Sequence, residues 1–362
     1  MPHDHKITTD IHVGDCCHVL ASLPDQSVNC CVTSPPYWGL RDYDVPPTVW
    51  PEIVYGTLGG SVTVPEMECC LGLEPTPDAF VGHLVHVFRE VRRVLKDDGT
   101  LWLNLGDSFA NGGRSTRATD AKLPSRGMDV RPADPVGIKP KDLIGIPWRV
   151  AFAFQADGWF LRQDIIWYKP NAMPESVRDR CTKAHEYVFL LSKSKRYYYD
   201  SDAIKEPASK GNAGSELHTG KTGVHQQGRA STKPRTAGNK NHKYVDAYEG
   251  SPTEEHRTKA GLMKVADVPW ETRNKRSVWT IASRPYAGAH FATMPPELAE
   301  TCVLAGCPEG GTVLDPFGGS GTTAGVAKKH WRKAIVCELN EGYAALMPDR
   351  IDSIAGSMPL LA

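Results

Sequence analysis

Apolar residues along the chain gather in short continuous runs or in helical repeats, and the two kinds alternate. Residues 27–33 (SVNCCVT) form a short, β-rich run that leads directly into Ser34, Pro35 and Pro36. Proline cannot extend a central strand, because it has no amide hydrogen to donate to the ladder. The pattern predicts a buried strand that ends in a loop, and such loops usually carry the chemistry of open α/β sheets.

A helix and a second strand follow. Apolar residues recur at three- and four-residue spacing from Phe80 to Leu95, which predicts an amphipathic helix. Residues 100–105 (TLWLNL) then read as another buried strand. Residues 44–77, which precede this helix, are rich in Pro and Gly and predict an irregular insertion.

The same alternation continues to the end of the chain. The further predicted elements are a helix over 147–156, strands over 159–169 and 185–191 that pair as a hairpin, a strand over 311–315, a glycine-rich turn over 316–321, a helix over 322–330 and a strand over 334–338. Strands that alternate with helices predict an α/β fold with a mostly parallel, twisted sheet and helices on both faces.

Two polar regions interrupt this pattern. Residues 106–140 predict a long loop, and loops of that length in compact domains are usually functional or disordered. Residues 207–243 contain seven Lys and Arg against one Glu, a local charge near +6, and almost no large apolar residues. That composition fits equally a solvated linker and a surface that contacts phosphates.

Composition narrows the class of protein. The 362 residues are 40% hydrophobic, and the 42 Lys and Arg balance the 42 Asp and Glu, so any basic surface must be local. No run of about 18 apolar residues or N-terminal signal pattern occurs, so we expect a cytoplasmic protein without a membrane span. The ten cysteines include three adjacent pairs and no two CxxC pairs, so we expect neither disulfides nor a bound metal.

The glycine-rich turn is the first candidate site. Phe317, Gly319 and Gly321 lie between a predicted strand, which ends at Asp315, and a predicted helix. Glycines let the backbone approach a ligand closely. Glu338 ends the next strand, and this is the position at which nucleotide-binding units carry an acid that binds ribose. A simple tight connection is the alternative, and a dinucleotide dehydrogenase would require a third glycine. The bulky Phe317 instead suits a cofactor with a sugar and an amino-acid tail.

The loop Ser34-Pro35-Pro36-Tyr37 is the second candidate site. An aromatic amine is a poor nucleophile, because its lone pair is delocalised into the ring. The hydroxyl of Ser34 and the carbonyl of Pro35 could accept its hydrogens and localise that lone pair, and Tyr37 could stack on the base. Rigid prolines would hold the acceptors in place before the substrate arrives. A plain surface turn is the alternative.

Together the two sites resemble those of the β-class DNA amino-methyltransferases, which act on N4 of cytosine or N6 of adenine. The resemblance also extends to segments at 14–15, 20–28, 169–171, 290–293 and 295–296. In this class the catalytic loop precedes the cofactor turn, so the resemblance implies a circularly permuted, Rossmann-like methyltransferase fold. It also implies S-adenosylmethionine as the cofactor and double-stranded DNA as the partner.

The resemblance assigns roles to individual residues. It implies catalysis by the loop 34–37, and a cofactor site formed by Asp15, Thr293, Asp315, Phe317, Gly319, Gly321 and Glu338. Glu338 would bind the ribose hydroxyls, Asp15 would lie near the adenine end, and Thr293 near the methionine end. Candidate DNA-binding residues in the basic region are Lys221, Arg229, Lys233 and Arg235.

The expected organisation is one methyltransferase domain in two halves. Residues 1–200 form the catalytic half, with insertions at 44–77 and 106–140, residues 201–280 form a target-recognition or flexible basic region, and residues 281–362 form the cofactor half. The resemblance also implies cytosine N4 as the target, because Ser at the first motif position is commoner among the cytosine enzymes of this family, with adenine N6 as the alternative. An RNA or protein amide methyltransferase and a catalytically silent DNA-binding module are further alternatives. A cognate restriction endonuclease fits this class, and the oligomeric state stays open.

Overall fold

The computed structural model describes residues 7–110, 137–208, 272–284 and 293–357. The chain divides into two units. The first comprises Met1–Ile204 together with Arg276–Ala362, and the second is Lys205–Lys275. The first unit contains both candidate sites.

An eight-stranded sheet forms the centre of the first unit. Its strands are, in spatial order, β1 (Thr9–Val13), β14 (Lys333–Glu338), β13 (Thr312–Asp315), β2 (Val28–Thr33), β7 (Leu95–Leu105), β9 (His185–Ser192), β8 (Phe160–Tyr168) and β12 (Val278–Thr280). Strand β9 runs antiparallel to β7 and β8, and the other neighbours in the sheet pair in parallel. The predicted mostly parallel sheet and the predicted hairpin of β8 with β9 are confirmed.

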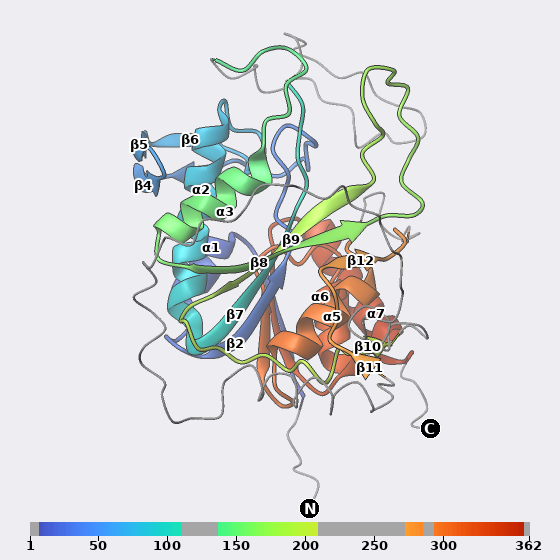
Figure 1. Cartoon of the computed structure of the whole chain (residues 1–362). Helices are drawn as coiled ribbons and strands as arrows, with labels where there is room; N and C mark the ends of the chain where they lie inside the picture. Colours follow the sequence, from blue (N-terminus) through green and yellow to red (C-terminus); the bar gives the residue numbers. More distant parts are fainter. Residues whose placement is uncertain (1–6, 111–136, 209–271, 285–292, 358–362) are drawn as a thin grey trace, which may run out of the picture. The chain divides into compact units, whose positions relative to one another are not determined.

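Helices cover both faces of this sheet (Figure 1). One face carries α1 (Cys16–Ser22), α2 (Pro77–Val94) and α3 (Ile146–Ala156), and the other carries α5 (Pro296–Gly306), α6 (Thr322–Lys329) and α7 (Glu341–Ala355). Successive side chains of a strand point to opposite faces. Accordingly Cys31 of β2 packs in the core beneath α2, whereas Cys30 and Val32 pack in the core beneath α5 and α6.

The neighbouring strands β13 and β2 are followed by connections that lead to opposite faces of the sheet. Helix α6 leads from β13 to β14 on one side, and α2 leads from β2 to β7 on the other. At such a switch point the loops after the two strands separate and leave a crevice, which is where open α/β sheets bind ligands. The glycine-rich turn follows β13 and the Ser34 loop follows β2, so the topology brings the two candidate sites together.

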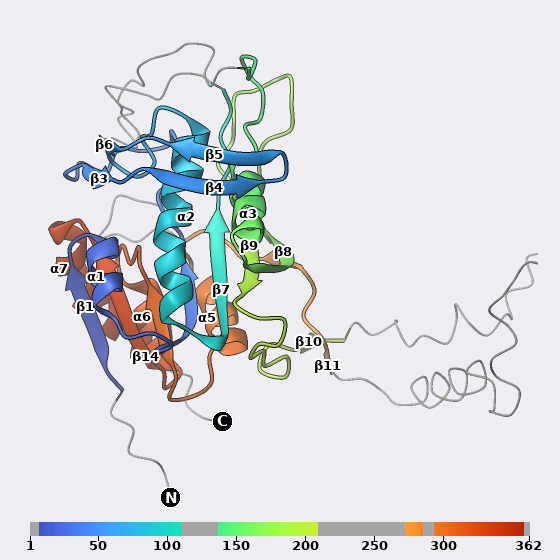
Figure 2. The same cartoon turned by 90° about the vertical axis from the view of Figure 1, so that its left-hand side faces the viewer.

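The insertion at 44–77 is more regular than predicted. It contains β3 (Thr48–Trp50) paired with β6 (Met67–Cys69) and β4 (Ile53–Thr57) paired with β5 (Gly60–Val64), and Pro77 already begins α2. The β4–β5 hairpin packs on α2 and α3 (Figure 2), so closely that a Cβ added to Gly82 would lie 2.8 Å from Val64 Cγ2. The prediction of an irregular segment was therefore wrong, because strands of three to five residues give too little alternation to recognise.

The described part of the second unit is a short antiparallel pair. Strand β10 (Glu206–Pro207) pairs with β11 (Thr272–Arg273), and Arg273 donates to Glu206 at 2.8 Å.

None of the helices in the described residues combines the length and the apolar surface needed to cross a lipid bilayer.

Candidate active site at the ends of strands β13 and β2

The glycine-rich turn has a backbone that other residues adopt at a cost. Gly319 has φ of +53° and Gly321 has φ of +83°, both in the left-handed region that favours glycine. A Cβ at Gly321 would lie 3.2 Å from Met347 and from Ile351, whereas a Cβ at Gly319 would meet nothing within 4 Å. The turn therefore packs on α7 at Gly321 and presents bare backbone to open space at Gly319, as a cradle for a ligand requires.

Glu338 is bound to this turn. Its Oε2 accepts a hydrogen bond from the amide of Gly319 and its Oε1 from the amide of Asn340, both at 2.8 Å. Burial raises the pKa of this carboxyl, and the two amide donors partly offset that effect. Each carboxylate oxygen keeps a further lone pair, so Glu338 can hold the turn and accept hydrogen bonds from a ligand at the same time.

Polar atoms without partners lie beside the turn. Ser320 Oγ and Thr322 Oγ1 are buried and have no hydrogen-bond partner among the described residues. Helix α6 begins at Thr322 with no side-chain cap on its first turn, so its first amides are available to a ligand. Phe317 adds an apolar wall, with its ring 6.4 Å from that of Phe88. These polar atoms and this apolar wall fit S-adenosylmethionine, which carries hydroxyls, an amino-acid tail and a flat aromatic purine.

Asp315 joins the turn to the neighbouring strand. Its Oδ1 accepts from Thr33 Oγ1 at 2.6 Å and from the amide of Phe317 at 3.1 Å. The residue is buried, and this burial raises the pKa of its carboxyl. Since Thr33 immediately precedes the Ser34 loop, a single carboxylate braces both candidate sites.

Asp15 lies just beyond the strand that pairs with the strand of Glu338. Strand β1 pairs with β14, and the amide of Gly14 donates to the carbonyl of Glu338 at 2.8 Å. Asp15 itself caps α1 by accepting from the amide of Cys17 at 2.7 Å, and it also accepts from Thr48 Oγ1 at 2.9 Å. Thr293, the remaining predicted cofactor residue, is half-buried and lies just before α5.

The Ser34 loop is partly buried, and Gly106 contacts the ring of its Tyr37. Pro35 is buried, while Ser34 and Tyr37 are half-buried. The ring of Tyr37 lies directly on Gly106, because a Cβ at Gly106 would be 2.6 Å from Tyr37 Cε2. Any side chain at position 106 would displace this ring, so the glycine after β7 fixes where Tyr37 lies.

A network of polar side chains surrounds Ser34 and Tyr37. Asn104 Nδ2 lies 3.2 Å from Ser34 Oγ and 3.0 Å from Glu186 Oε2, and it also contacts the Tyr37 hydroxyl. The Tyr37 hydroxyl donates to Glu186 Oε2 at 2.8 Å, and Ser34 Oγ donates to Tyr37 at 3.2 Å. The carboxylate can only accept, so Asn104 must present its amide nitrogen here. Its Oδ1 is buried without a partner among the described residues.

Glu186 also forms an ion pair at the end of β8. Lys169 Nζ binds Glu186 Oε1 and lies 4.1 Å from the centre of the Trp167 ring. Burial acts to raise the pKa of Glu186, but the charge of Lys169 and the donors Asn104 and Tyr37 outweigh it and lower the pKa below its usual value. Glu186 is therefore an anion at neutral pH inside the site.

The sequence reasoning missed Asn104 and Glu186. Strands β2 and β7 pair with Thr33 opposite Leu103, so Asn104 lies beside Ser34, and Glu186 is near the start of the antiparallel strand β9. Each was a single polar residue in an apolar run, TLWLNL for Asn104 and HEYVFLL for Glu186. A polar residue at a strand end next to the catalytic loop was the available signal.

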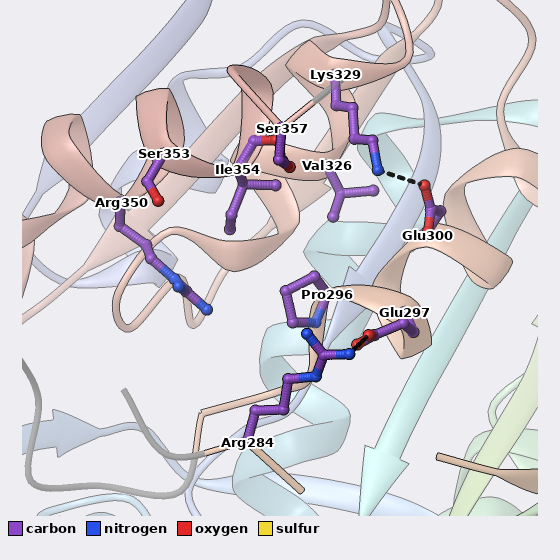
Figure 3. A pocket seen from close by; sticks show the side chains of 10 residues that line it. All are labelled: Arg284, Pro296, Glu297, Glu300, Val326, Lys329, Arg350, Ser353, Ile354 and Ser357. Carbon is purple, nitrogen blue, oxygen red and sulfur yellow. Dashed lines mark hydrogen bonds and ion pairs between the residues drawn. The ribbon is translucent and has the colours of Figure 1, made fainter. Parts of the chain in front are cut away.

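Other features lie outside this site. The candidate DNA-binding residues Lys221, Arg229, Lys233 and Arg235 lie outside the described residues. A pocket of about 320 Å³ lies among α5, α6 and α7 (Figure 3), where Arg284 pairs with Glu297 and Lys329 with Glu300. Since these two cations already have carboxylate partners and neither candidate loop lines the pocket, we do not assign the reaction to it.

Known proteins resemble the chain in sequence and fold. The family model described as DNA methylase (N6_N4_Mtase) matches residues 28–348. Type II methyltransferase M.SmaI of Serratia marcescens is 44% identical, over 94% of this chain and 90% of the relative. Type II methyltransferase M.Cfr9I of Citrobacter freundii is 41% identical, over 93% and 86%.

Two solved structures share the fold. PvuII DNA methyltransferase (cytosine-N4-specific) superposes with a TM-score of 0.52 at 17% identity, over 97% of this chain and 93% of that one. A putative DNA modification methylase of Thermus thermophilus, in complex with S-adenosyl-L-methionine, also gives 0.52, at 22% identity, over 97% and 96%. The predicted Rossmann-like methyltransferase fold is confirmed.

Proposed function

Because the chain belongs to the DNA methylase family and is an S-adenosylmethionine-dependent DNA methyltransferase, we propose that it methylates the exocyclic N4 amine of a cytosine extruded from duplex DNA. The observation that carries this proposal is the position of Ser34. Ser34 directly follows β2, which pairs with β13, and the turn after β13 is the proposed cofactor site. The Ser34 hydroxyl lies in a network of hydrogen-bonding groups. The motif residue Ser34, where adenine enzymes more often carry Asp, supports cytosine over adenine.

The catalytic loop acts on the amine. Ser34 Oγ and the Pro35 carbonyl accept its two hydrogens and shift the nitrogen toward tetrahedral geometry, which localises the lone pair. Asn104 donates to Ser34 and so fixes the direction of the remaining lone pairs of that hydroxyl. Bound S-adenosylmethionine supplies an electrophilic methyl group on sulfur. Holding the amine within about 3 Å of that methyl accounts for much of the rate.

Tyr37 supports the extruded base. Its ring is held against Gly106 at the Cδ2 and Cε2 atoms, and we propose that the base stacks on this ring. Base–aromatic stacking contributes about 1–3 kcal/mol per base. The hydroxyl is held by Glu186 and Asn104, so we propose that Pro36 and Tyr37 are ordered before DNA binds.

The cofactor residues divide into contacts and braces. We propose that the backbone of Gly319 and Gly321 and the ring of Phe317 line the cofactor, and that Glu338 accepts from its ribose hydroxyls. Asp15 would lie toward the adenine end and Thr293 toward the methionine end. Asp315 already accepts from Thr33 and Phe317, so its role is to brace the turn.

Recognition of a particular DNA sequence is assigned to the middle region. We propose that residues 201–280, with Lys221, Arg229, Lys233 and Arg235, contact the phosphates and the target site. The relatives are Type II methyltransferases, which supports a role in restriction-modification beside a cognate endonuclease. A cytoplasmic location is supported by ten cysteines that are all free thiols.

Methylation of DNA by the purified protein tests the proposal. Unmethylated duplex DNA is incubated with tritiated S-adenosylmethionine, and the digested nucleosides are identified by mass spectrometry. N4-methylcytosine is the expected product. N6-methyladenine would keep the amine chemistry and overturn the base assignment, while absence of any methylated nucleoside, with the cofactor bound, would overturn the proposed function.

A further inference from the structure

Ser34, Tyr37 and Glu186 form a chain of hydrogen bonds in which each hydroxyl donates to the next residue. Ser34 donates to the Tyr37 hydroxyl at 3.2 Å, and Tyr37 donates to Glu186 Oε2 at 2.8 Å. An ionised carboxylate has no hydrogen to give, so Tyr37 must be the donor to it, and its oxygen is then free to accept from Ser34. The chain of donors therefore runs from the catalytic serine outward and ends on an anion.

Amine methylation releases a proton that must leave the site. The nitrogen carries a positive charge after the methyl group joins it, and an aryl-ammonium nitrogen is a strong acid. The Ser34 hydroxyl accepts the amine hydrogen, but it cannot keep a second proton of its own. It can accept this proton only by passing its own proton onward, and the next oxygen in the structure is that of Tyr37.

We propose that Glu186 is the terminal acceptor of the amine proton, which reaches it through Ser34 and Tyr37. This inference rests on the proposed role of Ser34 and applies to cytosine and adenine amines alike. The N–CH₃ bond forms as the sulfur–methyl bond breaks, and the sulfur keeps that electron pair. The nitrogen proton then moves to Ser34 Oγ, the Ser34 proton to Tyr37 and the Tyr37 proton to Glu186 Oε2, so two hydroxyls are regenerated and one carboxyl is formed.

The surroundings of Glu186 suit this task. Lys169 from the end of β8 binds its other oxygen. This cation, with Asn104 and Tyr37, keeps the carboxylate ionised until the proton arrives, and a weak base is sufficient for so strong an acid. The negative charge also stabilises the positive charge that develops on the amine during attack.

Three variants test the proton path. Glu186→Gln keeps the shape of the side chain and removes the proton acceptor, and Tyr37→Phe removes the middle hydroxyl while it keeps the ring. Each should slow single-turnover methyl transfer about 100-fold, within the usual range for a proton-transfer group. The double variant should be no more than about threefold slower than either single variant, because groups that act as a unit are not additive.

The controls separate proton transfer from structural damage. Dissociation constants for S-adenosylmethionine and DNA should stay near wild-type values in Glu186→Gln, although loss of the ion pair with Lys169 should lower the Tm. Glu300→Gln, which removes a lysine-paired carboxylate on α5 away from the site, should methylate normally. In Glu186→Ala, added formate should restore the rate at least tenfold, which a purely structural role would not allow.

The outcomes are distinct. A Glu186→Gln rate within threefold of the wild type, additive effects in the double variant, or no rescue by formate in a folded Glu186→Ala would overturn the proton path. If the alanine variant does not fold, the double-variant comparison decides. A wild-type protein that methylates no DNA would overturn the proposed function instead, so the two failures are separable.

Discussion

The two halves of the candidate active site are built from different material. On the β13 side, the backbone of Gly319 and Gly321 forms the turn, and Glu338 binds that backbone from the next strand. On the β2 side, the site consists of side chains from the ends of four strands. Tyr37 follows β2, Asn104 is in β7, Glu186 is in β9 and Lys169 follows β8. One half is compact along the chain, and the other exists only after the sheet has formed.

This difference has a functional meaning. A backbone cradle binds by shape and tolerates changes in the side chains around it. A buried polar network depends on every member, because an unsatisfied partner in a low-dielectric site is costly. We therefore expect the cofactor half to govern affinity and the catalytic half to govern rate.

Removing the serine hydroxyl should produce the largest effect. We expect Ser34→Ala to lower turnover about 100- to 1000-fold, comparable to the loss of one preorganised catalytic hydrogen bond, and to leave S-adenosylmethionine affinity within twofold. Steady-state kinetics and calorimetry measure the two quantities. Ser108→Ala, which removes a hydroxyl that donates to the carbonyl of Trp38 nearby, is the matched control. If Ser34→Ala lowered S-adenosylmethionine affinity as much as turnover, the proposal that the catalytic half governs only the rate would be wrong.

The reciprocal change lies in the cofactor half. Glu338→Gln should weaken S-adenosylmethionine binding about 10- to 150-fold, since hydrogen bonds to charged groups contribute about 1.5–3 kcal/mol. Turnover at saturating cofactor should change little. Glu341→Gln, at the exposed start of α7, controls for the lost charge. Unchanged affinity, measured by calorimetry, would refute the ribose-binding role.

One substitution should affect both halves. Thr33→Val removes the hydroxyl that donates to Asp315, and we expect unfolding stability to fall by about 1–3 kcal/mol, the usual cost of an unpaired buried group. Cofactor affinity and turnover should each fall several-fold. Thr33→Ser keeps the donor and should behave like the wild type. If only one of the two quantities responds, Asp315 does not couple the halves.

The smallest effect concerns a thiol in the first turn of α1, two residues after Asp15. Hydrogen bonding to Cys16, opposed by burial and assisted by His86, lowers the pKa of Cys17 to about 7. The thiolate is the reactive form, so alkylation by iodoacetamide should rise between pH 6 and 8 with a midpoint near 7. Mass spectrometry of the Cys17 peptide follows the rate. A midpoint near the usual thiol pKa of about 8.5 would contradict the shift.

The same contrast explains what the sequence allowed us to predict. The α/β pattern, the helix ending near Leu95 and both motif loops were recognisable, because each depends on neighbours in the chain. The family and its cofactor followed from these motifs and are confirmed. Asn104, Glu186 and Lys169 were not assigned to catalysis, since their meeting depends on strand order and register, which no local pattern encodes. The short strands of residues 48–69 were missed for want of length.

The β10–β11 pair has a consequence for how such proteins diversify. Glu206 lies opposite Arg273 and Pro207 opposite Thr272. The two residues that flank the middle region, Pro207 and Thr272, are therefore neighbours in space. An insert with neighbouring ends can be lengthened at little entropic cost, because each doubling of a flexible loop adds only about 0.6 kcal/mol. We have proposed that this middle region recognises the target site, and we therefore expect that a segment grafted between Pro207 and Thr272 changes the DNA sequence that is methylated and leaves the paired strand ends in place.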